Sequence, residues 1–267
     1  MQGKWMKIAI AGAAMLTLLA CSFSSIDVGT AQTGPLESET VTVEAEGAEE
    51  VRVTISMGAG ELEIDGGAQD LLEAEFTYNI ADWEPEVSYE VSEDEGRLTV
   101  RQPNTNNLPI NSRVRYEWDL RFAEGVPLDM RIEGGAGRQD IDLAGLEVTD
   151  LDIRLGAGDA EINLSNNPAL SRFDLNIGAG ETRVDLNGPW DRNADIDIQG
   201  GVGRTELLLP RDVGVRVEVS RGIGDVDASG LYRQGSAWVN DAFGESDVTL
   251  EVRIQAGIGS IELDVRE

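Results

Sequence analysis

One short motif, Gly-x-Gly followed by alternating residues, recurs seven times along the chain. Its first glycine stands at positions 58, 135, 156, 178, 201, 222 and 257, so the spacings from position 135 onward are 21, 22, 23, 21 and 35 residues. The first copy precedes the second by 77 residues. A period near 22 residues is typical of repeat proteins, in which each unit packs on its neighbours.

Hydrophobic residues occupy the same places around every copy. The third and fifth positions before the first glycine are apolar in all seven copies, as Ile153 and Leu151 illustrate, and the sixth position after it is apolar too, as at Ile162. The residues between them are mostly charged or polar, such as Asp152 and Arg154. Alternation with a period of two predicts a β-strand with one buried face on each side of a Gly-x-Gly corner.

Two short strands cannot enclose a core alone, but stacked copies can, with equivalent apolar side chains in columns about 4.8 Å apart. The glycines of each copy then permit a sharp corner or a positive φ angle, and they let adjacent coils approach without a Cβ clash. We therefore expect a structural role for both glycines of every copy: Gly58, Gly60, Gly135, Gly137, Gly156, Gly158, Gly178, Gly180, Gly201, Gly203, Gly222, Gly224, Gly257 and Gly259.

Two longer segments interrupt the repeat. Between the first two copies, alternating segments such as LLEAEFTYNI and EVSYEVS predict an antiparallel β-module over residues 51–127, which caps one end of the stack. Such a cap covers strand edges that would otherwise pair with other chains. Near residues 231–248, a Gly- and Ser-rich stretch predicts a hairpin insertion that packs against the last coil.

The predicted fold class is therefore all-β. A right-handed parallel β-solenoid of about 22-residue coils spans residues 128–267, and the N-terminal antiparallel β-module precedes it. The right hand follows from the general chirality of parallel crossover connections.

The chain begins with three zones that suit an exported protein. A basic start is followed by an apolar run of 13 residues from Ile8 to Ala20, and then by Cys21. Thirteen residues are too few to cross a bilayer, which takes about 20, but they suit a signal peptide. The tetrapeptide LLAC at the end of the run resembles the bacterial lipobox, which implies a lipoprotein signal peptide over residues 1–20 and lipidation of Cys21. The alternative is a secreted protein whose cysteine is incidental.

Composition narrows the function classes. The 267 residues include 50 acidic and 21 basic side chains, no histidine and one cysteine, and the formal net charge is −29. Zinc, haem and iron–sulfur sites, and Ser- or Cys-His catalysis, need residues that the chain lacks, so no cofactor is predicted. Strong negative charge repels phosphate backbones, which excludes a nucleic-acid partner. The acidic segment over residues 21–50, rich in Ser, Thr and Gly, predicts a flexible, extended tether.

The stretch from Met57 to Pro103, which begins MGAGELEIDGGAQDLLEAEFTYNI, resembles the N-terminal module of the bacterial toast_rack family. The remainder, beginning VPLDMRIEGGAGRQDIDL, is similar to the β-solenoid shared by LiaF-type cell-wall-stress proteins and bacterial adhesins. The resemblance covers nearly all of the chain from about residue 51 onward. It implies a β-solenoid on the bacterial envelope and no catalytic residue. LiaF-type proteins usually carry transmembrane helices before this domain, whereas a lipobox takes their place here.

Five places after the first glycine, the repeat carries a column of mostly acidic residues. In a stack these side chains share one outer face, where like charges repel unless a cation or an arginine lies among them. Glu161, Glu206 and Asp227 are therefore candidate ligands for calcium or magnesium. The alternative, which we favour, is an ordinary acidic surface partly neutralised by arginines such as Arg183, so no metal is assigned.

Aromatic side chains supply candidate contacts with a partner, because they stack on sugar rings and anchor interfaces, although they also fill solenoid ends. Trp83 and Trp190 lie in turn-like sequence and are the interaction candidates. Two carboxylates at a suitable separation can hydrolyse a glycosidic bond, but no pair stands out by motif.

Together these features predict a lipid-anchored, non-enzymatic protein on the extracytoplasmic face of the bacterial cell envelope. It would contact the membrane through its N-terminal lipid and bind an envelope protein or a glycan, as an adhesin-like or envelope-stress module. Two alternatives stay open: a structural or protective surface component without a specific ligand, and a carbohydrate-active enzyme.

Overall fold

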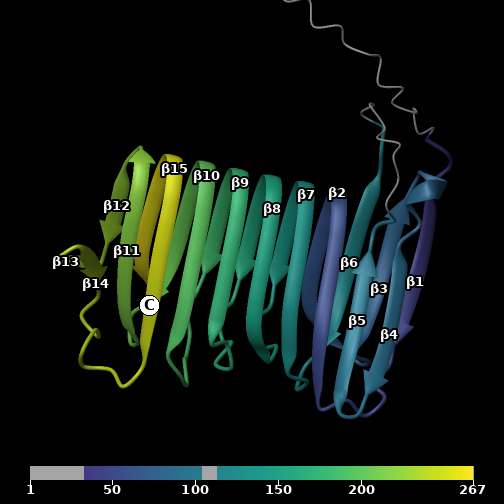
Figure 1. Cartoon of the computed structure of the whole chain (residues 1–267), viewed down its shortest axis with the longest axis horizontal. Helices are drawn as coiled ribbons and strands as arrows, with labels where there is room; N and C mark the ends of the chain where they lie inside the picture. Colours follow the sequence, from purple (N-terminus) through teal and green to yellow (C-terminus); the bar gives the residue numbers. More distant parts are fainter. Residues whose placement is uncertain (1–32, 104–112, 267) are drawn as a thin grey trace, which may run out of the picture.

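The computed structural model describes residues 33–103 and 113–266 (Figure 1). The described residues form one sheet of 15 strands and a short 3-10 helix, η1 (Ala81–Trp83). None of their helices is long and apolar enough to cross a membrane. The predicted signal peptide over residues 1–20 and Cys21 lie outside the described residues. The strands are β1 (Glu37–Val43), β2 (Glu50–Ala68), β3 (Leu72–Tyr78), β4 (Glu86–Ser92), β5 (Glu95–Arg101), β6 (Tyr116–Ala123), β7 (Leu128–Asp142), β8 (Val148–Asn163), β9 (Arg172–Asp185), β10 (Ala194–Pro210), β11 (Gly214–Ile223), β12 (Val226–Ser229), β13 (Tyr232–Gln234), β14 (Ala237–Val239) and β15 (Thr249–Arg266).

Six long strands, β2, β7, β8, β9, β10 and β15, each run through one Gly-x-Gly copy and bend there. The remaining copy, which begins at Gly222, lies where β11 ends, just before β12. We call each of these seven units a rung, the part before the glycines its first layer and the part after them its second layer. Neighbouring rungs pair in parallel with matching positions opposite one another, such as Ile132 with Ile153 and Gly137 with Gly158. The predicted all-β stack of parallel coils is confirmed.

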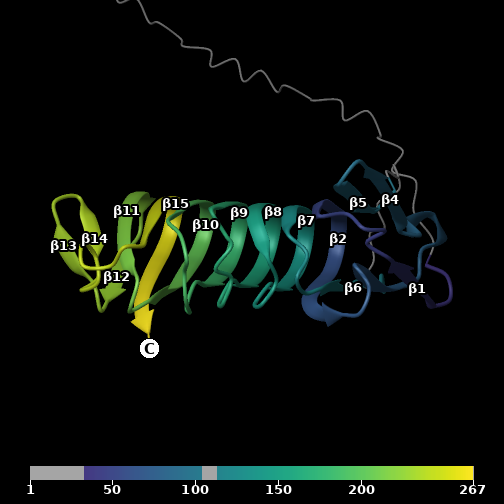
Figure 2. The same cartoon turned by 90° about the horizontal axis from the view of Figure 1, so that it is seen from below.

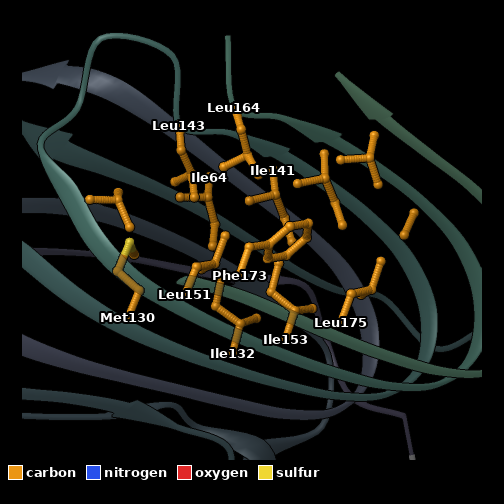
Figure 3. Packing of buried hydrophobic residues seen from close by; sticks show 14 of the residues in the cluster. Ile64, Met130, Ile132, Ile141, Leu143, Leu151, Ile153, Leu164, Phe173 and Leu175 are labelled. Atoms are coloured by element: carbon orange, nitrogen blue, oxygen red, sulfur yellow. The ribbon is translucent and has the colours of Figure 1, made fainter. Parts of the chain in front are cut away.

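The apolar columns of the two layers face one another and form the core (Figure 3). Ile132, Ile153 and Leu175 of the first layer are fully buried, and Ile141 of the second layer lies opposite them. Loops close the side away from the corner and add buried leucines such as Leu143. The sequence alternation therefore reports the inward and outward faces of each layer correctly.

The order of rungs in the stack differs from their order in the chain. β15 lies between β10 and β11, so the seventh copy of the motif occupies the sixth place and β11 ends the stack (Figure 1). The hairpin of β13 and β14 pairs antiparallel with β11, the last rung of the stack, for example Arg216 with Val239, whereas the last coil in chain order, β15, lies inside the stack. The reason is that both edges of β15 are already paired, whereas β11 has an edge to cover.

The N-terminal strands gather at the other end of the stack (Figure 2). β3 pairs antiparallel with β1 and β6, and β4 with β5, as the predicted module requires. β5 and β6, however, pair in parallel with the two halves of β2, and β2 pairs directly with β7. The sheet therefore runs unbroken across the predicted boundary between residues 127 and 128, and β2 is the first rung of the stack.

Part of the segment predicted to be a tether folds onto this sheet. β1, Glu37–Val43, lies within residues 21–50 and pairs along its whole length with β3. The tether prediction is wrong for these residues, because the alternation ending at Val41 and Val43 supplies apolar side chains that pack against the core.

Candidate functional site

The corner of each rung is built from two glycines in close contact with the next rung. At Gly158 the φ angle is +142°, and a Cβ atom there would lie 1.7 Å from the carbonyl oxygen of Gly137. At Gly156 a Cβ atom would lie 2.2 Å from the carbonyl oxygen of Gly135. The later rungs repeat this geometry, so neither position has room for a side chain.

An open groove of about 1240 Å³ follows this corner across the first layer. β8, β9, β10, β15 and β11 each contribute the first glycine of the motif and the two residues before it, and β7 contributes Gly134. We call this feature the corner groove. Because its glycines have no side chains, backbone forms part of its floor, beside the buried side chains of Leu155 and Ile177. None of the described residues that line it is acidic.

Uncharged amide side chains run along the corner groove in register. Asn176 on β9, Gln199 on β10 and Gln255 on β15 occupy equivalent positions on adjacent strands. We call these three residues the amide row. Their side-chain amides make no hydrogen bond with any other residue that the structure describes. Arg154 precedes the row on β8, bonded to Asp152 through its Nε and Nη2 atoms.

The far end of the corner groove lies on β11. Ser220 occupies the next position of the amide row's register, beside Gln255. Arg221 follows it, exposed and without an ion pair within residues 33–103 and 113–266. The groove therefore offers unused hydrogen-bond donors and acceptors along its length and a free positive charge near its end.

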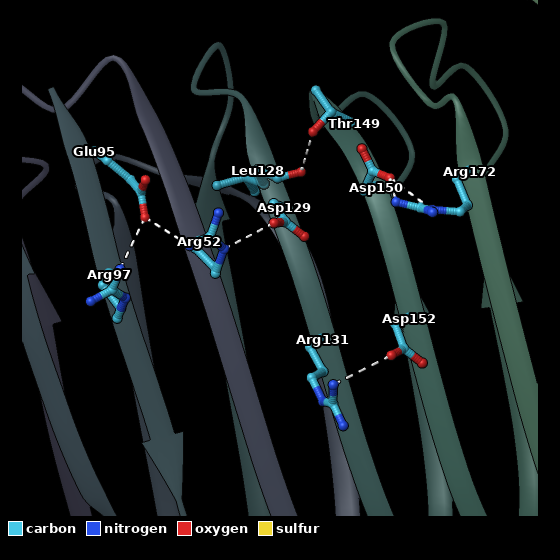
Figure 4. A network of polar contacts seen from close by, with 10 residues as sticks. All are labelled: Arg52, Glu95, Arg97, Leu128, Asp129, Arg131, Thr149, Asp150, Asp152 and Arg172. Atoms are coloured by element: carbon cyan, nitrogen blue, oxygen red, sulfur yellow. Dashed lines mark hydrogen bonds and ion pairs between the residues drawn. The ribbon is translucent and has the colours of Figure 1, made fainter.

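The other outward positions of the first layer have a different character, because their charges are paired (Figure 4). Arg52 lies 3.0 Å from Asp129 and 2.9 Å from Glu95, measured between guanidinium nitrogen and carboxylate oxygen. Arg172 lies 3.0 Å from Asp150 on the adjacent strand. Such exposed pairs contribute about 0–1 kcal/mol each. The amide row differs from this surface, because its side chains are uncharged and form no ion pairs.

An apolar ridge runs beside the corner groove. The middle residue of the Gly-x-Gly motif is Val202 on β10, Ile258 on β15 and Ile223 in the last rung, and these three side chains are 54%, 52% and 71% exposed. They are neighbours in the strand register, and we call them the corner ridge. In β7, β8 and β9 the same position holds alanine. A contiguous exposed apolar patch of this kind is typical of an interaction surface.

The acidic column of the second layer does not bring the predicted cation ligands together. Arg183 lies between Glu161 and Glu206: its Nε atom is 4.0 Å from a Glu161 oxygen, and its Nη1 atom donates a hydrogen bond to Glu206. Asp227 lies beside Glu262 on β15. In the described part of the chain, no group of three acidic, histidine or cysteine side chains is arranged to hold a metal ion.

Carboxylates crowd nearer the N-terminal end of the second layer, where Arg121 lies 3.9 Å from Asp119. Burial, followed by repulsion from Asp65 and then Asp119, raises the pKa of Glu63 above its ordinary value. Burial also raises the pKa of Asp65, with repulsion from Asp142 as the next cause and only a small opposing effect of Arg121. This acidic surface disfavours an anionic partner and lies in the other layer from the corner groove.

The two predicted interaction candidates are core residues. Trp83 is 2% exposed and its ring meets that of Tyr116 edge-on, with centroids 5.1 Å apart. Trp190 is 6% exposed and its Nε1–H donates to the carbonyl oxygen of Leu186 at 3.0 Å. The prediction of a partner contact at these tryptophans is therefore wrong, since neither ring is accessible.

Comparisons with known proteins identify relatives of the two parts of the chain. The family described as the N-terminal domain of toast_rack matches residues 32–171, and the family described as the C-terminal part of the cell wall-active antibiotics response protein LiaF matches residues 169–263. No curated protein matches.

A solved structure shares the fold. A candidate cell adhesion protein from Clostridium sporogenes is 28% identical, with a TM-score of 0.68 over 87% of this chain and 100% of that chain. A candidate adhesin from Bacteroides fragilis is 10% identical, with a TM-score of 0.38 over 85% of this chain and 96% of that chain. Because the toast_rack match covers more than half of the 267 residues and the folds agree, the chain belongs to the toast_rack family.

Proposed function

We propose that this protein is an adhesin-like module of the bacterial cell envelope, anchored by a lipid on Cys21, and that it binds an envelope protein or a glycan in the corner groove without catalysing a reaction. The observation that carries the proposal is the corner groove itself. In a chain with a net charge of −29, it has no acidic lining, it presents unpaired amides, and it borders an exposed apolar ridge. Such a surface does not repel partners by charge, and a partner that binds there can form hydrogen bonds and bury apolar side chains.

The arrangement of the chain supports presentation of the groove away from the membrane. β1 lies at one end of the stack, whereas the corner groove extends from β7 to β11, toward the other end (Figure 1). A lipid on Cys21 would therefore hold the N-terminal end near the bilayer. The similarity to the cell adhesion candidate from Clostridium sporogenes supports the same function.

A blocking substitution tests the proposal without disturbing the core. Gln199→Trp places a bulky ring in the middle of the corner groove at an exposed position, and Gln234→Trp places the same ring on the exposed hairpin strand β13 as a matched control. The full chain, purified in mild detergent, is used to capture components from envelope fractions. We expect one saturable partner that the wild type and Gln234→Trp retain and Gln199→Trp loses.

The opposite result is equally informative. If the three proteins capture the same components, or none, binding in the corner groove is refuted. A structural or protective surface component without a specific ligand would then be the better account of the stack.

A further inference from the structure

We infer that the ligand of the corner groove is a neutral, linear glycan that lies across the strands, parallel to the axis of the stack. The inference rests on the proposed function, because it concerns the same groove, and it adds the chemical class and the direction of the ligand. Three observations carry it: the repeat distance of the groove, the chemistry of the amide row, and the position of the corner ridge.

The repeat distance favours a sugar chain over a peptide. Rungs follow one another at the strand spacing of about 4.8 Å, and each brings one side chain of the row to the groove. One sugar ring in an extended glycan is close to this length. An extended peptide advances about 3.3 Å per residue and repeats its facing side chains about every 6.6 Å, so it falls out of step with the rungs.

Over most of its length, the backbone of the groove is also unavailable to a peptide. Peptides that bind sheets usually add a strand to an open edge, where main-chain groups are free. The corner groove crosses the interior of the sheet, and β9, β10 and β15 are paired on both sides. Along these three strands a ligand can bond only to side chains. Only on β11 is the outer edge open within the groove, because β14 pairs with it no further than Glu218.

The amide row matches the hydroxyl and acetamido groups of neutral sugars. A carboxamide donates two hydrogen bonds and accepts two, as adjacent hydroxyl groups on a sugar require. Asn176, Gln199 and Gln255 hold this capacity unused within the described residues. A charged row would instead favour an ionic ligand, and the paired charges elsewhere on the first layer show that charged side chains are the rule there.

The corner ridge completes the fit. Sugar rings present C–H groups on their faces, and Val202 and Ile258 supply exposed apolar side chains on the same rungs as Gln199 and Gln255. The glycines between the ridge and the amide row leave the groove floor low enough for a flat ring to approach the backbone. A sugar on β10 or β15 would thus meet an amide on one side and an apolar side chain on the other.

The test measures binding of neutral oligosaccharides to the full chain in detergent by titration calorimetry. The probes are β-1,4-linked glucose and N-acetylglucosamine chains of two to eight units. Five rungs, β8, β9, β10, β15 and β11, contribute three residues each to the groove, so we expect affinity to rise with chain length and to level off near about five sugars. We also expect little dependence on salt, because the contacts made by the amide row and the corner ridge are uncharged.

Two variants locate the binding. Each lost hydrogen bond weakens affinity roughly two- to tenfold, so the double variant Gln199→Ala with Gln255→Ala should bind at least about fivefold more weakly. Gln199→Glu, which keeps the size of the side chain, should weaken binding as well. The matched control is Gln234→Ala, an exposed glutamine on the hairpin, which should bind as the wild type does.

The outcomes separate this inference from the proposed function. Oligosaccharide binding that the amide-row variants leave unchanged overturns the inference, and so does a stronger response to anionic glycans than to neutral ones. If no oligosaccharide binds but an envelope protein is captured and Gln199→Trp abolishes that capture, the inference fails and the proposed function stands. If neither is captured, both fail.

Discussion

Substitution of Gly158 by alanine tests the close approach of rungs that shapes the whole stack. A Cβ atom at this position would lie 1.7 Å from the carbonyl oxygen of Gly137, whereas ordinary contact begins at 3.4 Å, so the two rungs must move apart by more than an ångström. A side chain at a φ of +142° adds backbone strain of about 1–3 kcal/mol, and forcing a methyl group into a packed site costs about 1–3 kcal/mol. We therefore expect Gly158→Ala to lower the free energy of unfolding by roughly 2–6 kcal/mol.

Two matched glycine substitutions separate the causes. Gly145 has a φ of +80° but nothing within 4 Å of its added Cβ, so Gly145→Ala measures the backbone strain without the clash. At Gly66 an added Cβ would meet the Leu146 side chain at 3.4 Å, and its φ lies outside the strained range, so Gly66→Ala should change little.

The assay is urea denaturation of the full chain and its variants, followed by circular dichroism of the β-sheet. Midpoints should fall in the order Gly66→Ala, Gly145→Ala, Gly158→Ala, with the last clearly the lowest. If Gly158→Ala unfolds at the same urea concentration as Gly145→Ala, the glycines are needed for their φ angle alone and the close approach of rungs is not what requires them.

Three further predictions address charge, packing and the anchor. The pKa of Asp65 is raised in the folded state, so ionisation of this carboxyl destabilises the fold. Asp65→Asn should therefore raise the melting temperature at pH 7, and this gain should shrink as the pH is lowered through the carboxyl range. A gain that stays the same at low pH would contradict this cause. Trp190→Ala should lower the free energy of unfolding by about 3–5 kcal/mol in denaturant titrations while oligosaccharide affinity stays the same, and a selective loss of affinity would restore its predicted role as an interaction residue. Cys21→Ala should abolish fatty-acid labelling and membrane fractionation of the protein, with unchanged labelling ruling out lipidation at this cysteine.

The repeat could be predicted from the sequence because the residues of each rung determine which of its side chains face the core and where the rung bends. Alternation around the glycines states which side chains point inward, and the structure buries the predicted apolar columns. The order of the rungs is not encoded in this way. All rungs share nearly the same cross-section, so the cross-section alone does not specify that β15 lies between β10 and β11. The 35-residue spacing before the last copy was the only sign of this excursion.

The two incorrect tryptophan predictions share a physical cause. The sequence around Trp83 and Trp190 is turn-like, which predicts exposure, but a loop that closes a stack needs large side chains to fill the space that the layers leave. The Trp190 indole N–H is satisfied by a carbonyl four residues earlier, which removes the cost of burying it. Turn composition therefore predicts where the chain leaves the sheet, and not whether a side chain faces water.

The amide row is visible in the aligned repeats, although the acidic column is the more conspicuous pattern. Two places before the first glycine, the copies on β9, β10, β15 and β11 carry Asn, Gln, Gln and Ser, whereas most other outward columns carry charges. A column that departs from the charged pattern of its neighbours is a better signal of function in a repeat protein than the commonest residue type on its surface.

The position of the candidate site follows from the construction of the stack. Neighbouring rungs approach so closely that neither glycine position has room for a side chain. The surface along the corner is therefore backbone, and it lies lower than the side chains beside it. The inward positions are committed to the core. On the side of the corner that carries the groove, the middle residue of the motif and the residue two places before it face outward and can vary without loss of packing. These are the two places at which the chain replaces small or charged residues with the exposed apolar side chains of the corner ridge and the unpaired amides of the amide row. A fold that must be glycine-lined along one corner thus confines the specificity of its binding surface to two columns, and both columns differ here from the rest of the surface.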